Sequence, residues 1–171
     1  NVALAYVAGD AEEDGRDNVG MKFQMEQEFD TLDELAIAKA AVEKALSGLA
    51  AEQPASRTCA IAFQNLAAAS LLGVFASIFS AEAAQKGLSL LKGREGEAIA
   101  SAAVTIVDDP HRPHSVASKP FDGEGVPTRK KKVVEKGVLK TLLHNLTTAA
   151  KQGVATTGNA ARGYASAVGV A

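Results

Sequence analysis

The chain has 171 residues and a mass of 17.6 kDa, which suits one globular domain or one and a half small ones. Its formal net charge of −2, from 18 Lys and Arg against 20 Asp and Glu, excludes a nucleic-acid-binding protein with a uniformly basic surface. No run of eighteen apolar residues is present, and the single cysteine excludes an internal disulfide framework, so we expect a cytoplasmic protein without a membrane span.

The N-terminal part predicts a pair of strands. Residues 2–8 and 21–29 alternate between apolar and polar side chains, and the polar residues 9–18 between them predict a loop or hairpin tip. Ten acids and two bases lie in residues 1–35, a net charge of −8, so the remainder carries +6, most of it near residues 129–140. These regions are expected to be solvated faces, or to attract each other or a neighbour.

Alanine-rich helices are predicted in the middle of the chain. With 34 Ala and no Trp, the composition favours helices whose backbones approach closely. Thr31, followed by Glu34 three residues later, has the spacing of a capping box and predicts the start of the first helix. Asn65 and Ser80 are the predicted caps of a second and a third helix, and Gly87 ends the third.

The C-terminal part predicts mostly β-structure. The apolar runs 57–63 and 102–107 predict buried strands. Residues 128–134 and 138–143 predict paired strands around a turn in which Gly137 supplies the left-handed residue. The predicted fold class is therefore α+β, with Ala-rich helices packed on a mixed or antiparallel sheet and a β-rich C-terminal part.

Two loops and one short helix complete the predicted elements. Residues 108–127 are rich in Pro and Gly and predict a long loop, which in a compact domain is more often functional than a short one. Residues 145–152 predict a helix that Gly153 ends, and residues 156–159 predict another loop.

Few residues could carry chemistry. Two acids and two histidines lie close together in the sequence: Asp108, Asp109, His111 and His114. They could hold a metal or act in hydrolysis, although prolines interrupt any helix that would place both imidazoles on one face. Cys59 is predicted to be a buried apolar residue. The basic run 129–132 predicts an edge strand protected by lysines, or a phosphate contact without aromatic stacking.

Four blocks resemble the PmbA/TldD family in their order and spacing. They are Asp-Asp-Pro at 108–110, Ser-Lys-Pro-Phe-Asp-Gly-Glu-Gly-Val-Pro-Thr-Arg at 118–129, Val-Glu-Lys-Gly-Val-Leu-Lys at 134–140, and Thr-Thr-Gly-Asn-Ala at 156–160. The helical residues 65–93 fit the family as well. Because family members are much longer, we expect an interior piece. Residues 1–56 would end the N-terminal domain, and residues 57–171 would begin the C-terminal PmbA/TldD-type domain.

The resemblance also implies a division of labour within the family. TldD-type members carry His-Glu-x-x-x-His on a helix, in which two imidazoles bind zinc and the glutamate acts as general base. Counted back from Lys86 and Gly87, the motif falls on residues 72–77, which read Leu-Gly-Val-Phe-Ala-Ser here. This chain therefore resembles the PmbA (TldE) type, with no catalytic residue, metal or cofactor of its own. Zinc would belong to a TldD-type partner, or the chain would pair with a second copy.

The implied function is a role in a cytosolic metallopeptidase system that cleaves unfolded or extended peptides, in proteolysis and peptide maturation. The family is also described as modulators of DNA gyrase, so a nucleic-acid-binding or gyrase-binding protein that uses residues 129–132 is the alternative. A hydrolase that uses the 108–114 cluster is a third hypothesis. The candidates for a substrate path or an interface are Asp108, Asp109, Phe121, Asp122, Glu124, Gly125, Arg129, Thr157, Gly158 and Asn159.

Glycines in these segments predict tight turns. Gly123, Gly125 and Gly158 are expected to adopt positive φ angles, which side chains other than glycine disfavour. Replacing Gly125 by valine is therefore expected to damage folding or assembly more than any single lysine substitution.

Overall fold

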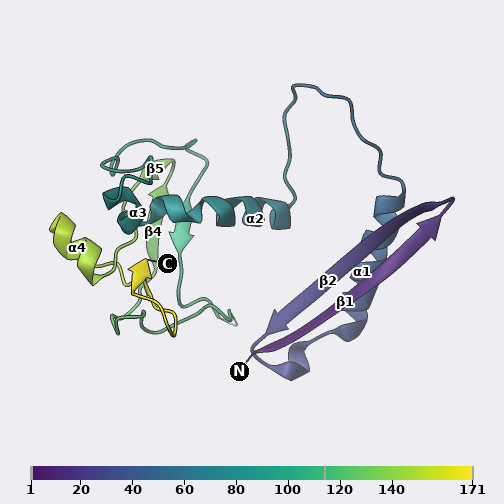
Figure 1. The fold of residues 1–171 in the computed structure, drawn as a ribbon, viewed down its shortest axis with the longest axis horizontal. Helices are drawn as coiled ribbons and strands as arrows, with labels where there is room; N and C mark the ends of the chain where they lie inside the picture. The colour runs from purple at the N-terminus through teal and green to yellow at the C-terminus, as the bar shows by residue number, and fades with distance from the viewer. Residues whose placement is uncertain (1, 114, 171) are drawn as a thin grey trace. The chain divides into compact units, whose positions relative to one another are not determined.

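A computed structural model describes residues 2–113 and 115–170. It forms two compact units (Figure 1). The N-terminal unit comprises residues 2–60 together with 115 and 116, and the C-terminal unit comprises residues 61–113 and 117–170. Across the described residues, every helix is too short or too polar to cross a membrane.

A long β-hairpin and one helix build the N-terminal unit. Strand β1 (Ala3–Glu13) pairs antiparallel with β2 (Arg16–Glu26), and helix α1 (Glu34–Leu49) lies along one face of the hairpin (Figure 1). The predicted strand pair is confirmed. The hairpin tip lies within the predicted residues 9–18, but it is only the two-residue turn of Asp14 and Gly15, and the rest of that range belongs to the strands.

Small residues let α1 approach the hairpin closely. A Cβ atom added to Gly20 in β2 would lie 2.0 Å from the carbonyl oxygen of Ala41 in α1. Ala41 and Ala45 are buried beside Ile37 on the same helix. In this unit, the contact between helix and hairpin is therefore made by closely approaching backbones at alanine and glycine, and not by large side chains.

The predicted capping box at Thr31 is wrong. Thr31 lies in a 3-10 turn, η1 (Phe29–Thr31), and its hydroxyl donates a hydrogen bond to the carbonyl oxygen of Glu28 at 2.7 Å. Asp33 caps α1 instead, because its side chain accepts a hydrogen bond from the backbone N–H of Ala36 at 2.9 Å.

The predicted buried strand at residues 57–63 is also wrong. These residues have no regular secondary structure and are exposed, and Cys59 among them is exposed rather than buried. A strand needs a neighbour for its backbone hydrogen bonds, and the part of the chain described here places none beside this segment. An apolar run alone could not reveal that.

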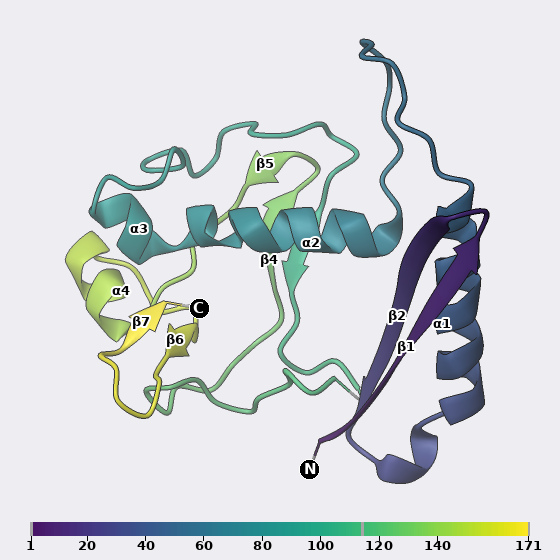
Figure 2. The same ribbon diagram turned by 45° about the vertical axis from the view of Figure 1, so that its right-hand side comes forward.

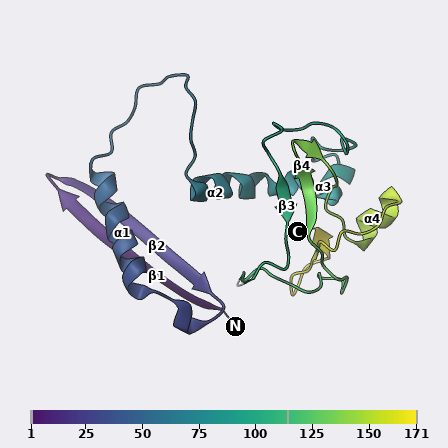
Figure 3. The same cartoon turned by 180° about the vertical axis from the view of Figure 1, so that it is seen from behind.

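The C-terminal unit combines short helices with small antiparallel sheets (Figures 2 and 3). Its helical segments are α2 (Asn65–Phe75), the 3-10 turn η2 (Ala76–Phe79), α3 (Ala81–Gln85) and α4 (Leu146–Gln152). Its strands are β3 (Ile106–Asp108), β4 (Lys131–Glu135), β5 (Val138–Leu139), β6 (Ala160–Ala161) and β7 (Gly169–Val170). One sheet has the order β3-β4-β5, and β6 pairs with β7. The predicted α+β class is confirmed.

Of the two predicted helix caps in this unit, the one at Ser80 is confirmed, because its side chain accepts a hydrogen bond at the start of α3. The predicted helix at residues 145–152 is also present, and Asn145 caps it in a reciprocal arrangement with Thr148. The predicted cap at Asn65 is one residue too late, because Asn65 is already helical and Gln64 occupies the cap position without a side-chain hydrogen bond.

The sheet strands are shorter than predicted. Of the predicted strand at residues 102–107 only the end pairs, because residues 101–104 form a turn in which Val104 N–H donates to the carbonyl oxygen of Ser101 at 2.9 Å. The predicted strand at 138–143 pairs with β4 only at Val138–Leu139, and Leu143 forms an isolated bridge with Ser80. One hydrophobic core stabilises the unit. It consists of residues from the sheet, from α3 and from the adjoining segments: Ala81, Ala84, Leu91, Val133, Val134, Leu139 and Leu142.

Candidate functional site

Three of the predicted segments meet in the C-terminal unit. They are residues 108–109 at the end of β3, residues 119–129 before β4, and residues 156–160 at the start of β6. Asp108 Oδ2 accepts a hydrogen bond from Asn159 Nδ2 at 2.8 Å. The Arg129 guanidinium donates to the carbonyl oxygen of Thr156 at 3.1 Å. Residues 51 and 27 positions apart in the sequence are thus joined directly.

Asp122 links the segment 119–129 to the segment 156–160 by hydrogen bonds. Its Oδ1 accepts from the backbone N–H groups of Glu124 at 2.9 Å and Val126 at 3.0 Å, and its Oδ2 accepts from that of Ala160 at 2.9 Å. The residue is 7% exposed. Burial acts to raise the pKa of Asp122, but the three N–H donors outweigh it, and the net pKa lies below the usual value of 3.8. Asp122 therefore works as a structural anion within this loop.

Two neighbours of Asp122, Glu124 and Phe121, have different surroundings. Glu124 Oε2 accepts from the backbone N–H of Leu146 at 2.8 Å, which places a carboxylate at the start of α4. Phe121 is 60% exposed. The Phe121 side chain is therefore available for contact with another molecule, whereas Asp122 is not.

The glycine predictions hold at two of three positions. Gly125 and Gly158 have positive φ angles of 79° and 69°. Gly123 does not, so that prediction is wrong. At Gly123 an added Cβ would lie 3.0 Å from the carbonyl oxygen of Ala160 and 3.0 Å from the backbone nitrogen of Arg162. Close approach of two backbones, rather than a left-handed turn, is what glycine permits there.

His144 organises the third segment, and sequence reasoning missed this role. Its backbone carbonyl oxygen accepts from the hydroxyls of Thr156 and Thr157, both at 3.1 Å, and from the Asn159 N–H at 3.3 Å. Its own N–H donates to Thr157 Oγ1 at 2.6 Å. The imidazole is 2% exposed, and burial lowers the pKa of His144 below 6.5. A neutral histidine is therefore buried behind the loop.

Sequence reasoning also missed the role of Lys131, which it treated only as part of the basic run 129–132. Its Nζ lies 2.6 Å from Asp108 Oδ2, and its side chain is only 11% exposed. Asp108 Oδ2 thus receives both Lys131 and Asn159. The signal that could have distinguished Lys131 from its neighbours is the alternation of side chains along a strand, because adjacent strand residues point to opposite faces.

The other basic residues of this run also have partners. Lys130 pairs with Asp109 at 2.6 Å, and its hydrogen bond is the main reason that the pKa of Asp109 lies below 3.8. Lys132 pairs with Glu135. Because carboxylates face these three lysines, the lysines present little uncompensated charge to a phosphate backbone. No observation on residues 129–132 favours the nucleic-acid alternative.

The 108–114 cluster does not assemble as a metal site in the described part of the chain. His111 Nε2 lies 3.0 Å from Thr128 Oγ1, and both aspartates are paired with lysines. His114 lies outside the described residues. Within residues 2–113 and 115–170, no three His, Cys, Asp or Glu side chains gather as metal ligands would.

We expect Gly125→Val to lower the free energy of unfolding by about 2 kcal/mol, because a β-branched side chain is strained at a φ of 79°. Lys130→Ala and Lys132→Ala should cost less, since both side chains are more than half exposed. Lys131 is set apart by its burial. Urea unfolding of the three variants tests this, and wild-type stability and solubility in Gly125→Val would contradict it.

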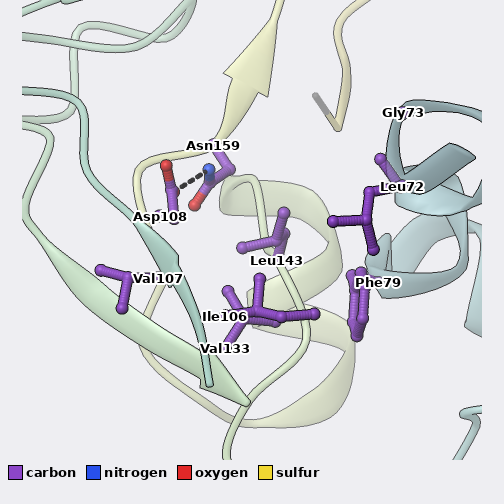
Figure 4. A pocket seen from close by; sticks show the side chains of 10 residues that line it. Leu72, Gly73, Phe79, Ile106, Val107, Asp108, Val133, Leu143 and Asn159 are labelled. Atoms are coloured by element: carbon purple, nitrogen blue, oxygen red, sulfur yellow. Dashed lines mark hydrogen bonds between the residues drawn. The ribbon is translucent and has the colours of Figure 1, made fainter. Parts of the chain in front are cut away.

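An apolar cavity of about 430 Å³ lies between α2 and the sheet (Figure 4). Leu72 and Phe79 form one side of it, and Ile106, Val133 and Leu143 lie opposite. Asp108 and Asn159, joined by their hydrogen bond, form its polar end. We call it the α2 cavity. Its full lining is Leu72, Gly73, Ala76, Phe79, Ile106, Val107, Asp108, Val133, Leu143 and Asn159.

Zinc does not fit the α2 cavity. Leu72, Gly73 and Ala76 line it with carbon atoms. Asp108 contributes the one carboxylate of the lining, and Lys131 and Asn159 already bond it. A structural or catalytic zinc needs three or four nitrogen, sulfur or oxygen ligands. The cavity instead suits an apolar group.

Comparisons with known proteins place the C-terminal unit in a family. Residues 56–171 match the model of the PmbA/TldA metallopeptidase C-terminal domain. An uncharacterized protein of Methanocaldococcus jannaschii is 46% identical over 88 residues, which are 52% of this chain and 21% of that protein. A metalloprotease of Archaeoglobus fulgidus is 39% identical over 100 residues, 58% of this chain and 23% of that protein.

Two solved structures resemble almost the whole chain. A proposed modulator of DNA gyrase from Thermotoga maritima matches with a TM-score of 0.82 and 37% identity, covering 98% of this chain and 38% of that one. TldE from Thermococcus kodakarensis matches with a TM-score of 0.80 and 25% identity, covering 99% and 39%. The chain spans between about a fifth and two fifths of the length of these relatives. It belongs to the PmbA/TldD metallopeptidase family.

Proposed function

We propose that this chain is part of a PmbA/TldE-like subunit of a cytosolic metallopeptidase that cleaves unfolded or extended peptides. Zinc and the activated water belong to a TldD-type partner subunit. This chain contributes the wall of the enclosure that admits the peptide and holds no zinc itself. The likeness to TldE from Thermococcus kodakarensis supports the subunit type.

The observation that carries the proposal is the lining of the α2 cavity. At the positions where TldD-type relatives carry His-Glu-x-x-x-His, this chain has Leu72, Gly73 and Ala76 facing an apolar space. In that motif the two imidazoles bind zinc and the glutamate acts as general base in hydrolysis of a peptide bond. A chain that lacks them there depends on another subunit for the chemistry.

The residues around Asp122 and Asn159 suit a path for an unfolded peptide. An extended peptide can be held by its main chain at a strand edge or along loop backbones, without strong selection of side chains. The loop before β4 is fixed by the three hydrogen bonds of Asp122, and Phe121 on it is exposed. A loop that is rigid in its backbone and open in its side chains can guide such a peptide.

Metal content and assembly test this proposal together. The full-length protein purified alone is expected to hold no stoichiometric zinc, measured by atomic emission. Co-expressed with a TldD-type relative, it should copurify as a complex that has one zinc per pair and cleaves an unfolded peptide.

The control is the TldD-type relative with both motif histidines replaced by alanine, which should still copurify but hold no zinc. One tightly bound zinc per chain in the isolated full-length protein would overturn the proposal. Peptide cleavage by that protein alone would overturn it as well. A stable homodimer that never binds the relative would point to the self-paired arrangement.

A further inference from the structure

A buried histidine lies in the segment that leads into α4. His144 is 2% exposed, and Leu142 and Asn145 on either side of it are buried as well. The backbone is held next to the histidine, because Leu143 N–H donates to the carbonyl oxygen of Phe79 at 2.8 Å and Asn145 caps α4. The imidazole therefore reaches solvent only when the structure around it moves.

One nitrogen of this ring has no partner. His144 Nδ1 is buried and has no hydrogen bond to any described residue. A neutral imidazole carries a proton on one nitrogen, whereas the imidazolium carries a proton on both. Protonation would therefore place a positive charge and an N–H without an acceptor in the interior, which is unfavourable. Because Nδ1 has essentially no accessible surface, neither water nor another segment can pair with it in this arrangement.

The electrostatic surroundings do not compensate for this cost. Burial lowers the pKa of His144 below its usual value of 6.5. The backbone of Thr148 and the carboxylate of Glu95 act in the opposite direction, but burial outweighs them. The neutral ring is therefore the form that the closed structure favours near pH 7.

The other charged groups on the elements around the ring offer it no free carboxylate. On α3, Glu82 pairs with Lys86 at 2.6 Å, and this hydrogen bond lowers the pKa of Glu82 below 4.5. The pKa of Asp122 lies below 3.8, and Glu124 is bonded to a backbone N–H of α4. Lys151, in the last turn of α4, is a cation. Glu82 and Asp122 thus change charge well below the pH at which an exposed histidine does.

The backbone of His144 connects the buried ring to the candidate site. Its carbonyl oxygen accepts three hydrogen bonds from residues 156–159, and its N–H donates to Thr157 Oγ1 at 2.6 Å. Asn159 on this loop donates in turn to Asp108 at 2.8 Å. A displacement of His144 therefore breaks the hydrogen bonds that hold the loop in the site.

We propose that protonation of His144 opens the loop at residues 156–160, so that the candidate site is assembled near neutral pH and comes apart in mild acid. The open loop lets the ring reach water, and it therefore binds a proton more readily than the closed loop. The closed loop is fully stabilised above pH 6.5 and loses stability as the pH falls toward the lower pKa of the buried ring. Each pH unit in that range should raise the open population about tenfold.

Hydrogen exchange of the full-length protein at pH 7 and pH 5, corrected for the intrinsic pH dependence of exchange, tests the proposal. The Asn159 and Ala160 amides report on the loop, because both donate hydrogen bonds within the site. We expect their protection to fall about tenfold between the two pH values. At pH 5 they should exchange faster than the amide of Leu139, a fully buried core residue, because the loop opens before the unit unfolds.

His144→Gln is the matched variant, since glutamine keeps a polar side chain that does not titrate. Its loop amides should be equally protected at pH 7 and pH 5. His111→Gln, which removes an exposed histidine of the same unit, should respond to pH as the wild type does.

Three results would overturn the proposal. They are unchanged protection of the wild-type loop at pH 5, an equal fall in His144→Gln, and equal exchange of the loop and of Leu139 at pH 5, which would mean that the unit unfolds as a whole. If His144→Gln does not fold, nuclear magnetic resonance of the wild type decides. The amide signals of Asn159 and Ala160 should then follow the titration of the His144 ring, and signals that ignore it would overturn the proposal as well.

Discussion

Replacing Asp122 by alanine is expected to lower the free energy of unfolding by about 3 kcal/mol. The carboxylate is 7% exposed and accepts three backbone hydrogen bonds, from Glu124, Val126 and Ala160. Alanine would leave these N–H groups without their acceptor in a region that water reaches poorly. The penalty for unsatisfied donors is larger than the net value of the hydrogen bonds themselves.

Urea unfolding of the full-length protein measures this effect, and Asp109→Ala is the matched control. Asp109 is an aspartate of the same site, but it pairs with Lys130, whose side chain is 67% exposed. Its removal should leave stability close to that of the wild type. Equal midpoints for Asp122→Ala and the wild type would show that the loop is not held by this carboxylate.

The loss of stability caused by Asp122→Ala is expected to depend on pH. Because the pKa of Asp122 in the folded protein lies below its usual value of 3.8, folding favours the ionised form. This stabilisation is fully present above pH 4 and is lost as the pH falls below 3.8 through the folded pKa. The stability difference between the wild type and Asp122→Ala should therefore shrink below pH 4. A difference that stays constant to pH 3 would contradict the assignment of the charge.

Local signals in the sequence were sufficient for part of this fold. Ser80 was recognisable as a cap because a cap acts on backbone groups two or three residues away. The turn around Gly137 was recognisable for the same reason. The segments that meet at Asn159 were identified by resemblance, and periodicity alone would not have joined residues 108, 122 and 159.

The failures have a common physical cause. Residues 57–63 have the composition of a buried strand, but whether a strand forms depends on a neighbour elsewhere in the chain. Thr31 and Asp33 are both good caps, and the 3-10 turn before α1 decided between them. The pairing of Lys131 with Asp108 and the burial of His144 depend on tertiary contacts, which no window of sequence contains.

Gly137→Ala is expected to destabilise the C-terminal unit by about 3 kcal/mol, more than any other glycine-to-alanine change in its turns. Gly137 has a φ of 81°, and a Cβ there would lie 2.3 Å from the carbonyl oxygen of Ala100 and 2.8 Å from that of Ser101. Backbone strain and a clash with backbone therefore act together. The contact cannot be relieved by a side-chain rotation, because both obstructing atoms belong to the main chain.

Comparison with Gly93→Ala separates the cost of backbone strain from the cost of the clash. Gly93 has a φ of 71°, but a Cβ there would meet nothing within 4 Å, so its cost should be the strain alone, about 1 kcal/mol. The Gly137 backbone also accepts hydrogen bonds from Ile99 and Ala100, which fasten the segment before β3 to the β4–β5 turn. Displacing Gly137 should therefore speed hydrogen exchange at Ile99 as well as lower the urea midpoint. Equal midpoints for the two alanine variants would mean that the segment moves aside without cost, and the sheet would not depend on this contact.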